Sequence, residues 1–568
     1  MSGGKPSKVE HVKRASSHLR GTIRQELDRP STHFSEEDYQ LLKFHGTYQQ
    51  HDRDTATRRK QQGLEKEHQF MVRVRIPGGR LTAAQYLDLD DLAGKYANGT
   101  LRITTRQGSQ LHGVLKGKLE RTIAEINATL LTTLGACGDV VRNLMAPPAP
   151  ILDGVHQRLA ADARRLSERL LPRTRAYHEI WLDGERMPAD AAEEEPLYGD
   201  TYLPRKFKIA LCTPDDNSVD VLANDVGIIA LFEGDELVGY NLALGGGLGM
   251  THNKPETYPR LATLTAFIEP DDLIRAVEAV IKLQRDHGDR SDRKRARLKY
   301  LIDDKGLDWI KSAFEGYFGG PLAEPRAMPP LGVVDHMGWH DQGDGRWYLG
   351  IPVESGRIRD GDEQHLRSSL REVLGKFGCN PILMPSQDIL LSEIAPEMRA
   401  SIERELRDHG ITLASDITPV RRWALACPAL PTCGLALTEA ERVQQPLVAD
   451  IEAVLERYGL AGERLSIRMT GCPNGCARPY TGDIGIVGRM PGYYALYVGG
   501  DFEGTRLSRC LLDKVALADI PDTLEPLFAD FARHRNIGEG FGDFCYRVGA
   551  EHLQRLVQDN VRSLPQAG

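Results

Sequence analysis

The chain has 568 residues, 41% of them hydrophobic and 27% charged, with a formal net charge of −8. This length exceeds what one hydrophobic core supports, so roughly two to four domains of an ordinary globular protein are expected. The acidic balance argues against a general nucleic-acid binder, although a small basic pocket for anions remains compatible with it.

The N-terminal segment is polar. Its first residues, MSGGKPSKVEHVKRASSHLRG, lack the apolar stretch of a secretory signal, and no apolar run reaches the roughly 18 residues that a transmembrane helix requires. A cytoplasmic protein without a membrane contact is therefore expected. We expect residues 1–68 to form an extended arm with some helix, which is either a solvated tail or a docking segment for a partner protein.

Beyond this arm the sequence repeats itself. VRVRIPGGRLT, a helical stretch and LRITTRQGSQLHGV are matched later by WYLGIPVESGRIRD, a helical stretch and PILMPSQDILLSEI. Both copies are typical of a strand, a turn, a helix and a second strand. The repeat predicts a small module that occurs twice.

A second repeat is clearer: KFKIALCTPDDNSVDVLANDVGIIA parallels RLSIRMTGCPNGCARPYTGDIGIVG. The chain therefore reads as two α+β halves, each with a small and a larger module, and one site between them is expected because ligands favour inter-domain clefts. The copies differ in that only the second has the two cysteines Cys472 and Cys476 in its turn. Their register pairs Asp225 with Asp483, Lys206 with Arg464, Pro214 with Cys472 and Ser218 with Cys476.

Four cysteines form two close pairs beside proline and glycine, Cys427 with Cys433 and Cys472 with Cys476. A disulfide in so small a ring is disfavoured in a reducing compartment, and unrelated buried thiols would not explain two pairs. Zinc favours short C-x2-4-C knuckles. An iron–sulfur cluster accepts thiolates from loops of variable length. The spacing therefore favours a cluster, with structural zinc as the alternative.

The TGCPNGC motif after C-x5-C resembles the signature of the siroheme-containing sulfite and nitrite reductases. LRGTI, FHGTYQQHDRD, RIPGG, RITTRQ, LPRTRAYHEIWLD, YLPRKFK, LGGGLG and GEGFGDF are similar to segments of the same family. Together they are most similar to the haemoprotein (beta) subunits of NADPH-dependent assimilatory sulfite reductases.

This resemblance implies an internally duplicated, pseudo-twofold α+β fold around a central cofactor site. It implies four parts: the arm of residues 1–68, a duplicated ferredoxin-like (parachute) domain of residues 69–134 and 335–411, a first siroheme-reductase module of residues 135–334, and a second module of residues 412–568 that carries the cluster cysteines.

The resemblance also implies the cofactors and the reaction. Four cysteines hold one [4Fe–4S] cluster, and the last of them also ligates the siroheme iron; the matching residues here are Cys427, Cys433, Cys472 and the shared Cys476. The implied reaction is the six-electron reduction of sulfite to sulfide for cysteine biosynthesis. Because the sequence has no nucleotide-binding fingerprint, NADPH, FAD and FMN are expected only on a partner flavoprotein (alpha) subunit.

Basic residues alternate in VRVRIPGG and RKFKIA, so each set lies on one side of a strand. Such a face either binds an anion or is an exposed cationic edge. By the resemblance, the substrate-binding residues are Arg73, Arg142, Lys206 and Lys208. The expected siroheme partners are Arg102, Arg106 and Gln110, with Arg205, Arg297 and Asn474 as further candidates.

Three details qualify this assignment. Arg297 stands where the family leads us to expect lysine, which keeps the charge but loses proton donation. His112 is expected to be a structural histidine, and LGGGLG to approach the macrocycle closely. The alternatives that remain are a ferredoxin-dependent sulfite or nitrite reductase and a non-catalytic protein stabilised by zinc.

Overall fold

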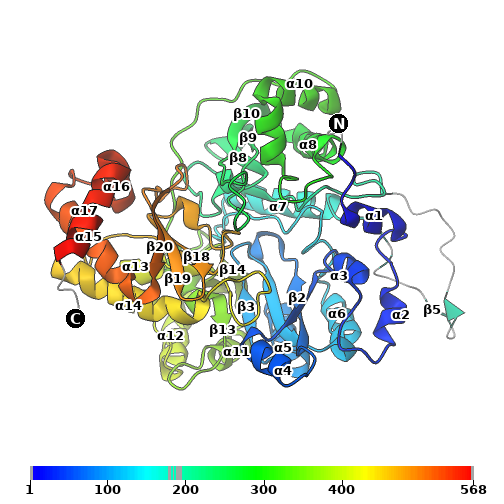
Figure 1. Cartoon of the computed structure of the whole chain (residues 1–568), viewed down its shortest axis with the longest axis horizontal. Helices are drawn as coiled ribbons and strands as arrows, with labels where there is room; N and C mark the ends of the chain where they lie inside the picture. The colour runs from blue at the N-terminus through cyan, green and yellow to red at the C-terminus, as the bar shows by residue number, and fades with distance from the viewer. Residues whose placement is uncertain (1–3, 175, 177–180, 183–184, 187–194, 564–568) are drawn as a thin grey trace.

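The computed structural model describes residues 4–174, 176, 181–182, 185–186 and 195–563. The motif LPRTRAYHEIWLD therefore lies partly outside the described residues. In Figure 1 the first large sheet (green) lies at the top, the C-terminal sheet and helices (orange to red) at the left, and the N-terminal helices (blue) at the right. None of the described helices is long and apolar enough to cross a membrane.

Two large sheets repeat one topology, in which a parallel strand pair is followed by two antiparallel strands. The same register recurs, since Ile209 pairs with Val226 and Ile467 pairs with Ile484. The predicted α+β duplication is thus confirmed. The strands are β7 (Ile209–Cys212), β8 (Val226–Glu233), β9 (Glu236–Leu244) and β10 (Thr263–Ile268), and then β16 (Leu425–Ala426), β17 (Ile467–Thr470), β18 (Ile484–Met490), β19 (Tyr493–Val498) and β20 (Arg509–Ala516).

Amphipathic helices cover each large sheet and share its core. In α8, for example, Leu273, Val277, Val280 and Ile281 recur at helical spacing and are all buried. The first sheet is covered by α7 (Gly154–Arg169), α8 (Leu273–His287), α9 (Leu298–Lys305) and α10 (Leu307–Phe318). The second is covered by α14 (Glu441–Arg457), α15 (Ile520–His534), α16 (Phe541–Val548) and α17 (Ala550–Ser563), with α13 (Pro419–Arg422) before it.

The two copies of the small module share one hydrophobic core, although each has its own sheet. One sheet contains β1 (Thr47–His51), β2 (His68–Val74), β4 (Ser109–Val114), β3 (Leu101–Ile103) and β13 (Arg357–Ile358). The other contains β11 (Gly338–Asp341), β12 (Trp347–Ile351), β15 (Ile389–Ile394) and β14 (Asn380–Leu383). Their helices are α5 (Ala83–Tyr96), α6 (Leu119–Ala128), α11 (Leu366–Phe377) and α12 (Arg399–Asp408), and a separate hairpin pairs β5 (Trp181–Leu182) with β6 (Glu185–Arg186).

Each copy has a glycine turn that packs closely against the backbone of the other copy. Gly79 has a φ of 75° and lies so close to Leu383 that an added Cβ would be 2.1 Å from its carbonyl oxygen. Gly356 has the same φ and lies against the carbonyl of Ile103, where a Cβ would be 2.3 Å away. Only glycine combines a positive φ with such an approach, so both turns require it. The β3–β4 turn lies beside both large modules, since Arg106 donates to the carbonyl of Ile209 and Thr105 to the carbonyl of Cys476.

The N-terminal segment differs from the extended arm that its composition predicts. It forms α1 (Lys8–Ala15), α2 (Ile23–Leu27), α3 (Glu36–Leu42), the edge strand β1 and α4 (Arg53–Gln61). Leu19 and Phe44 are buried in the core of the first large sheet, and Phe34 is buried in the core of the small modules. Charged residues of α1 are buried as well, because ion pairs with the distant residues Asp139 and Arg290 compensate them. Polar composition alone does not reveal such pairing.

Candidate anion and metal site

A cavity lies between the first large sheet and the turn that follows β17, and we call it the cation pocket. Its wall includes Asn474, Gly475 and Cys476 from that turn, and it contains no carboxylate. Such an unbalanced field attracts anions. Nine cationic side chains line it: Arg106, Arg205, Lys206, Lys208, Arg293, Lys294, Arg297, Lys299 and Arg478.

Lys206 and Lys208 lie in the extended segment just before β7, on either side of Phe207, which is buried in the core. Strand alternation therefore directs both lysines to the same side. Within the described part of the chain, neither ammonium group has a hydrogen-bond or ion-pair partner. Burial lowers the pKa of Lys206 to about 7, with help from Arg205 and Arg297, and burial and Arg106 hold the pKa of Lys208 well below its ordinary value. These amines are suited to exchanging protons with a bound anion.

Arg297 is fixed by the protein itself. Its guanidinium donates to both carboxylate oxygens of Asp225, at 3.2 and 2.6 Å, and to the carbonyl of Gly246 at 3.0 Å. The glycine run follows from this packing, since a Cβ on Gly247 would come within 2.4 Å of the Arg297 guanidinium. In this run, Gly249 lines the pocket, whereas Gly246 and Gly247 do not. The expected approach to a macrocycle thus rests on Gly249.

Arg106 reaches the pocket from the β3–β4 turn. It donates to the side-chain oxygen of Asn224 at 2.7 Å and to the carbonyl of Asn143 at 2.7 Å, while its buried Nε has no partner. Burial, together with the charge of nearby Arg142, lowers the pKa of Arg106 to about 9. A buried donor without a partner is costly. The Nε of Arg106 is therefore available to donate a hydrogen bond to a bound oxyanion.

The four predicted cysteines come together where β16 and β17 end. The Gly471 amide donates to Sγ of Cys427 and the Asn474 side chain donates to Sγ of Cys472, each at 3.3 Å. Burial raises the pKa of Cys427, Cys433 and Cys472, and Cys476 raises each of them further by its charge. All four are free thiols, and Cys476 is the one that also lines the cation pocket.

The spacing of these sulfur atoms separates two kinds of metal centre. Ligand atoms within 4.8 Å of one another gather in two described groups, His33 with Glu65 and His68, and Glu372 with Glu405 and His409, and the four cysteines form no such group. A single zinc ion with Zn–S bonds of about 2.3 Å would hold its sulfurs roughly 3.8 Å apart. In a [4Fe–4S] cluster each thiolate binds a different iron, so the sulfurs lie further apart. The arrangement fits a cluster better than zinc.

Two predicted substrate residues lie behind the pocket wall. Arg73 donates to Sγ of Cys137 at 3.1 Å and, with the Gln110 amide oxygen turned toward it, from its Nε to that oxygen at 3.2 Å. Arg142 donates to the carbonyl of Gly138 at 2.9 Å, and its charge lowers the pKa of Lys206. Neither arginine is part of the lining of this pocket.

Arg102 has a different environment from the expected one. Its guanidinium pairs with Glu441 at 3.1 Å and donates to the carbonyl of Ala426 at 2.9 Å. It therefore fixes the backbone beside Cys427, and Glu441 neutralises its charge. His112 is buried with no partner on either ring nitrogen, and burial holds its pKa well below the ordinary value, as expected of a neutral structural histidine.

The sequence reasoning missed four cations of the pocket. Arg293, Lys294 and Lys299 belong to the basic run RSDRKRARLK, which could have served as a signal. Lys299 donates to the carbonyls of Gly247 and Gly249, and burial lowers its pKa to about 6. The fourth residue is Arg478, next to the cysteine turn.

Comparisons with known proteins agree with this geometry. The family description "Nitrite and sulphite reductase 4Fe-4S domain" matches residues 161–322 and 420–563, and "Nitrite/Sulfite reductase ferredoxin-like half domain" matches residues 62–129. The second of the 4Fe-4S matches contains all four cysteines of the site.

Full-length relatives are also similar. "Sulfite reductase [ferredoxin]" of Synechococcus elongatus is 47% identical over 98% of this chain and 91% of that protein. "Sulfite reductase [NADPH] hemoprotein beta-component" is 47% identical in Myxococcus xanthus and 46% in Geobacillus kaustophilus, each over 96% of both chains. The solved structure of Mycobacterium tuberculosis NirA has the same fold, with a TM-score of 0.79 at 24% identity, covering 97% of this chain and 98% of that one.

Family and fold together confirm three predictions, namely the duplicated α+β architecture, an oxidoreductase, and siroheme with a [4Fe–4S] cluster as cofactors. The matches cover both large sheets and the first small module. The chain belongs to the nitrite and sulfite reductase family.

Proposed function

We propose that this protein is the haemoprotein component of an assimilatory sulfite reductase and reduces sulfite to sulfide with six electrons. The observation that carries this proposal is the acid-free cation pocket bordered by Cys476. The names of the relatives from Myxococcus xanthus and Geobacillus kaustophilus support it. When bound, siroheme and the cluster would relay electrons from the external donor, and siroheme would provide the position at which the substrate binds.

We assign the cofactor ligands by position. Cys427, Cys433, Cys472 and Cys476 would hold the cluster, and Cys476 would be shared with the siroheme iron because it alone of the four lines the pocket. The siroheme carboxylates require cations and amide donors. Those available in the pocket are Arg106, Arg205, Arg297 and Asn474, whereas Gln110 and Arg102 lie outside the lining.

The chain's own part in the chemistry is to hold the anion and move protons. Each oxygen that leaves sulfite departs as water and takes up protons, and Lys206 and Lys208 hold such protons at Nζ. Arg142 adds positive charge behind these lysines. Together with Arg73 it would steady the substrate oxygens through a forked guanidinium contact.

We also propose the division of the chain that the sequence predicted. The duplicated parachute domain (69–134 and 335–411) would support the two siroheme-reductase modules (135–334 and 412–568). The N-terminal segment 1–68 would belong to this body, since its helices pack on it. A cytoplasmic location, with neither nucleic acid nor membrane as a partner, stays part of the proposal.

The electron donor has two candidates. We propose NADPH acting through a flavoprotein (alpha) subunit with FAD and FMN, because relatives that cover 96% of this chain are named for NADPH. The Synechococcus elongatus relative favours ferredoxin as the second candidate.

One experiment tests both reaction and donor. The chain is produced with siroheme synthesis, its iron, sulfide and visible spectrum are measured, and kcat/KM is determined for sulfite and nitrite with flavoprotein plus NADPH and with reduced ferredoxin. We expect a red-absorbing haem–cluster spectrum and the highest kcat/KM for sulfite with the flavoprotein. A preference for nitrite would overturn the substrate, a preference for ferredoxin would overturn the donor, and an iron-free folded chain would overturn both.

A further inference from the structure

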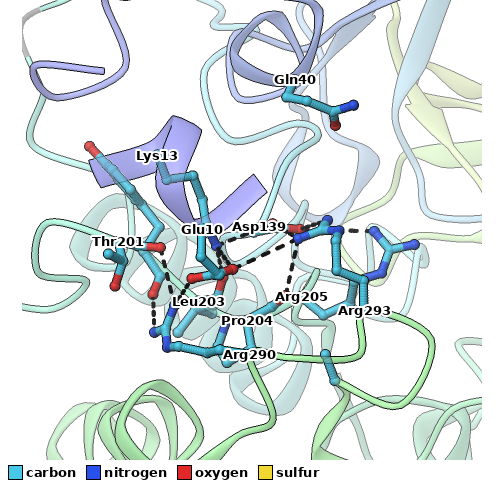
Figure 2. A network of polar contacts seen from close by, with 12 residues as sticks. Glu10, Lys13, Gln40, Asp139, Thr201, Leu203, Pro204, Arg205, Arg290 and Arg293 are labelled. Atoms are coloured by element: carbon cyan, nitrogen blue, oxygen red, sulfur yellow. Dashed lines mark hydrogen bonds and ion pairs between the residues drawn. The ribbon is translucent and has the colours of Figure 1, made fainter. Parts of the chain in front are cut away.

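A network of buried charges joins helix α1 to the wall of the cation pocket (Figure 2). Glu10 and Lys13 project from α1 and are only 3% and 1% exposed, although the segment is polar overall. Buried charges persist where they are paired and hydrogen-bonded. These two residues are therefore held by specific partners, all of which lie near the pocket.

Asp139 is the centre of this network. Both of its carboxylate oxygens accept from Arg293, at 2.7 and 3.0 Å, and Lys13 lies 3.4 Å from one of them. Arg205 is 3.9 Å away, beyond hydrogen-bond distance. Burial opposes the charge of Asp139, but Arg293 and Lys13 hold its pKa below the usual range. One carboxylate thus serves three cations, and Arg205 is the most weakly held.

Lys13 is fixed in its position by α1 and by the backbone. It lies 2.5 Å from Glu10 on the next turn of the same helix and donates to the carbonyl of Leu203 at 2.8 Å. Glu10 in turn pairs with Arg290, whose guanidinium also donates to the carbonyl of Tyr202 at 2.7 Å. The helix therefore delivers its ammonium group to the segment that leads into Arg205 and Lys206.

The contact between Lys13 and Asp139 affects the cation pocket because two arginines of the pocket wall also lie near Asp139. Arg205 and Arg293 both line the cation pocket, and Asp139 is the carboxylate that both approach. Without Lys13, one cation fewer would compensate the charge of Asp139. Arg205 would then be stabilised by moving closer and forming a direct ion pair with this carboxylate. That movement would draw its guanidinium toward Asp139 and away from the pocket.

We propose that Lys13 of helix α1, steadied by Glu10, is a positioning residue of the cation pocket, which occupies Asp139 and thereby keeps the Arg205 guanidinium available to an oxyanion. This inference rests on the proposed function, because that function makes the ligand of Arg205 either a carboxylate of the tetrapyrrole or sulfite. The N-terminal helix then belongs to the site and is more than a docking segment.

The test compares Lys13→Met with Lys8→Met, a matched control on the same helix whose lysine is exposed and pairs only with exposed glutamates. Siroheme per chain, the rate of siroheme loss to an apo-acceptor, and KM and kcat for sulfite are measured. If Arg205 serves the tetrapyrrole, Lys13→Met lowers siroheme content or speeds its loss. If it serves sulfite, siroheme content is unchanged and KM rises about tenfold while kcat stays within twofold, as expected for one weakened charge-assisted hydrogen bond. Lys8→Met changes none of these values.

A double-mutant cycle isolates the route through Arg205. In an Arg205→Met background, Lys13→Met should add less than a twofold change in either readout. An equal effect with and without Arg205 would show that Lys13 acts only by its charge, and this would overturn the proposal. Wild-type siroheme content and KM in Lys13→Met would overturn it as well.

Two further variants guard against misfolding. The double variant Glu10→Met/Lys13→Met removes both members of the ion pair, whereas Lys13→Arg keeps the positive charge. Thermal unfolding measures the stability of each variant. The paired variant should show the same loss as Lys13→Met, and Lys13→Arg should restore the wild-type values. If the wild-type chain itself bound no tetrapyrrole, the proposed function would fail. If the wild type contained siroheme and was active, and the Lys13 variants had the same siroheme content and KM, only this inference would be overturned.

Discussion

Each of the two large modules contributes a turn to a pocket, and the linings of the two pockets differ in their charged residues. The cation pocket uses the β17–β18 turn, with nine cations and no carboxylate. The pocket at the corresponding β7–β8 turn, here called the counterpart pocket, is lined by Asn217, Ser218 and Asp220. Its walls contain three carboxylates and three guanidinium groups: Asp220, Asp335, Asp388, Arg422, Arg468 and Arg478.

In the counterpart pocket two of the three carboxylates, Asp220 and Asp335, pair with the arginines. Arg422 pairs with Asp335 at 2.5 Å, and Asp220 pairs with Arg468 at 2.8 Å and with Arg478 at 3.0 Å. In the cation pocket, by contrast, the described residues provide no partner for the ammonium groups of Lys206 and Lys208. The two sides of the duplicated fold therefore differ most at these two lysines, and this difference supports the proposed anion site on their side.

Single positions account for this difference. In the sequence register Ser218 stands opposite Cys476, and Ser466 opposite Lys208. Ser466 is held by Asp483, to which its hydroxyl donates at 2.6 Å. Arg464, opposite Lys206, is half exposed and pairs with Glu503 at 3.3 Å. The thiol and both amines of one side have no equivalent on the other.

The largest expected effect comes from removing the residue that most separates the two pockets. Cys476→Ser makes the cysteine turn resemble its counterpart at Ser218, and we expect siroheme and iron content to fall and sulfite turnover to be lost, since hydroxyl is a poor ligand for such iron. Iron assay, visible spectrum and steady-state kinetics check this. The control is Cys510→Ser, at an exposed thiol of β20, which should keep all three. A red, active Cys476→Ser enzyme would contradict the shared-ligand assignment.

The next largest effect concerns proton delivery. Lys206→Met or Lys208→Met should lower kcat for sulfite by about 100-fold, the range typical of a lost general acid, while siroheme content is retained. Arg464→Met, at the counterpart position of Lys206, should change kcat by less than twofold because it lies outside the pocket. Equal effects of the lysine and arginine substitutions would remove the distinction between the two sides.

A pH effect on stability is expected in the counterpart pocket. Burial raises the pKa of Asp388 to about 7. Because this folded-state pKa lies above the unfolded value, the contribution to stability is complete below about pH 4 and is lost as pH rises through 7, about 4 kcal/mol at most. Asp388→Asn keeps acceptor and donor groups for Val353 and Ser386.

Chemical denaturation at pH 5 and pH 8 tests this contribution. The variant should be more stable than the wild type at pH 8, and the difference should shrink at pH 5. A pH-independent difference between the two proteins would refute the titration of Asp388. Asp344→Asn, at an exposed turn, is the control.

The smallest of the expected effects comes from an ion pair of the counterpart pocket. Arg468→Met leaves Asp220 buried with Arg478 as its remaining partner, so we expect a loss of about 3 kcal/mol in the free energy of unfolding. Arg457→Met, in an exposed pair with Glu525, should cost less than about 1 kcal/mol. Denaturant titration of both variants measures the difference. Equal costs would mean that the internal pairing of this pocket contributes little.

The sequence alone determined what depends on local order. The spacing of the cysteine pairs predicted a cluster, the repeats predicted two α+β halves, and strand alternation predicted that Lys206 and Lys208 point the same way. These features survive because strand period and turn chemistry are encoded within short segments. The motifs also identified part of the pocket lining, including Arg106, Lys206 and Asn474, but missed four of its nine cations.

Tertiary structure decided which charges stay available. Arg102 has a nearby carboxylate because Glu441, 339 residues away, packs beside it. Lys13 can be buried because the Asp139 carboxylate and the Leu203 carbonyl accept from its ammonium group. Pairing between distant segments has no period that a sequence window can detect, and it determines the cost of burying each charge. For this reason the sequence predicted which thiols to propose as ligands, whereas the fold determined which cations line the pocket.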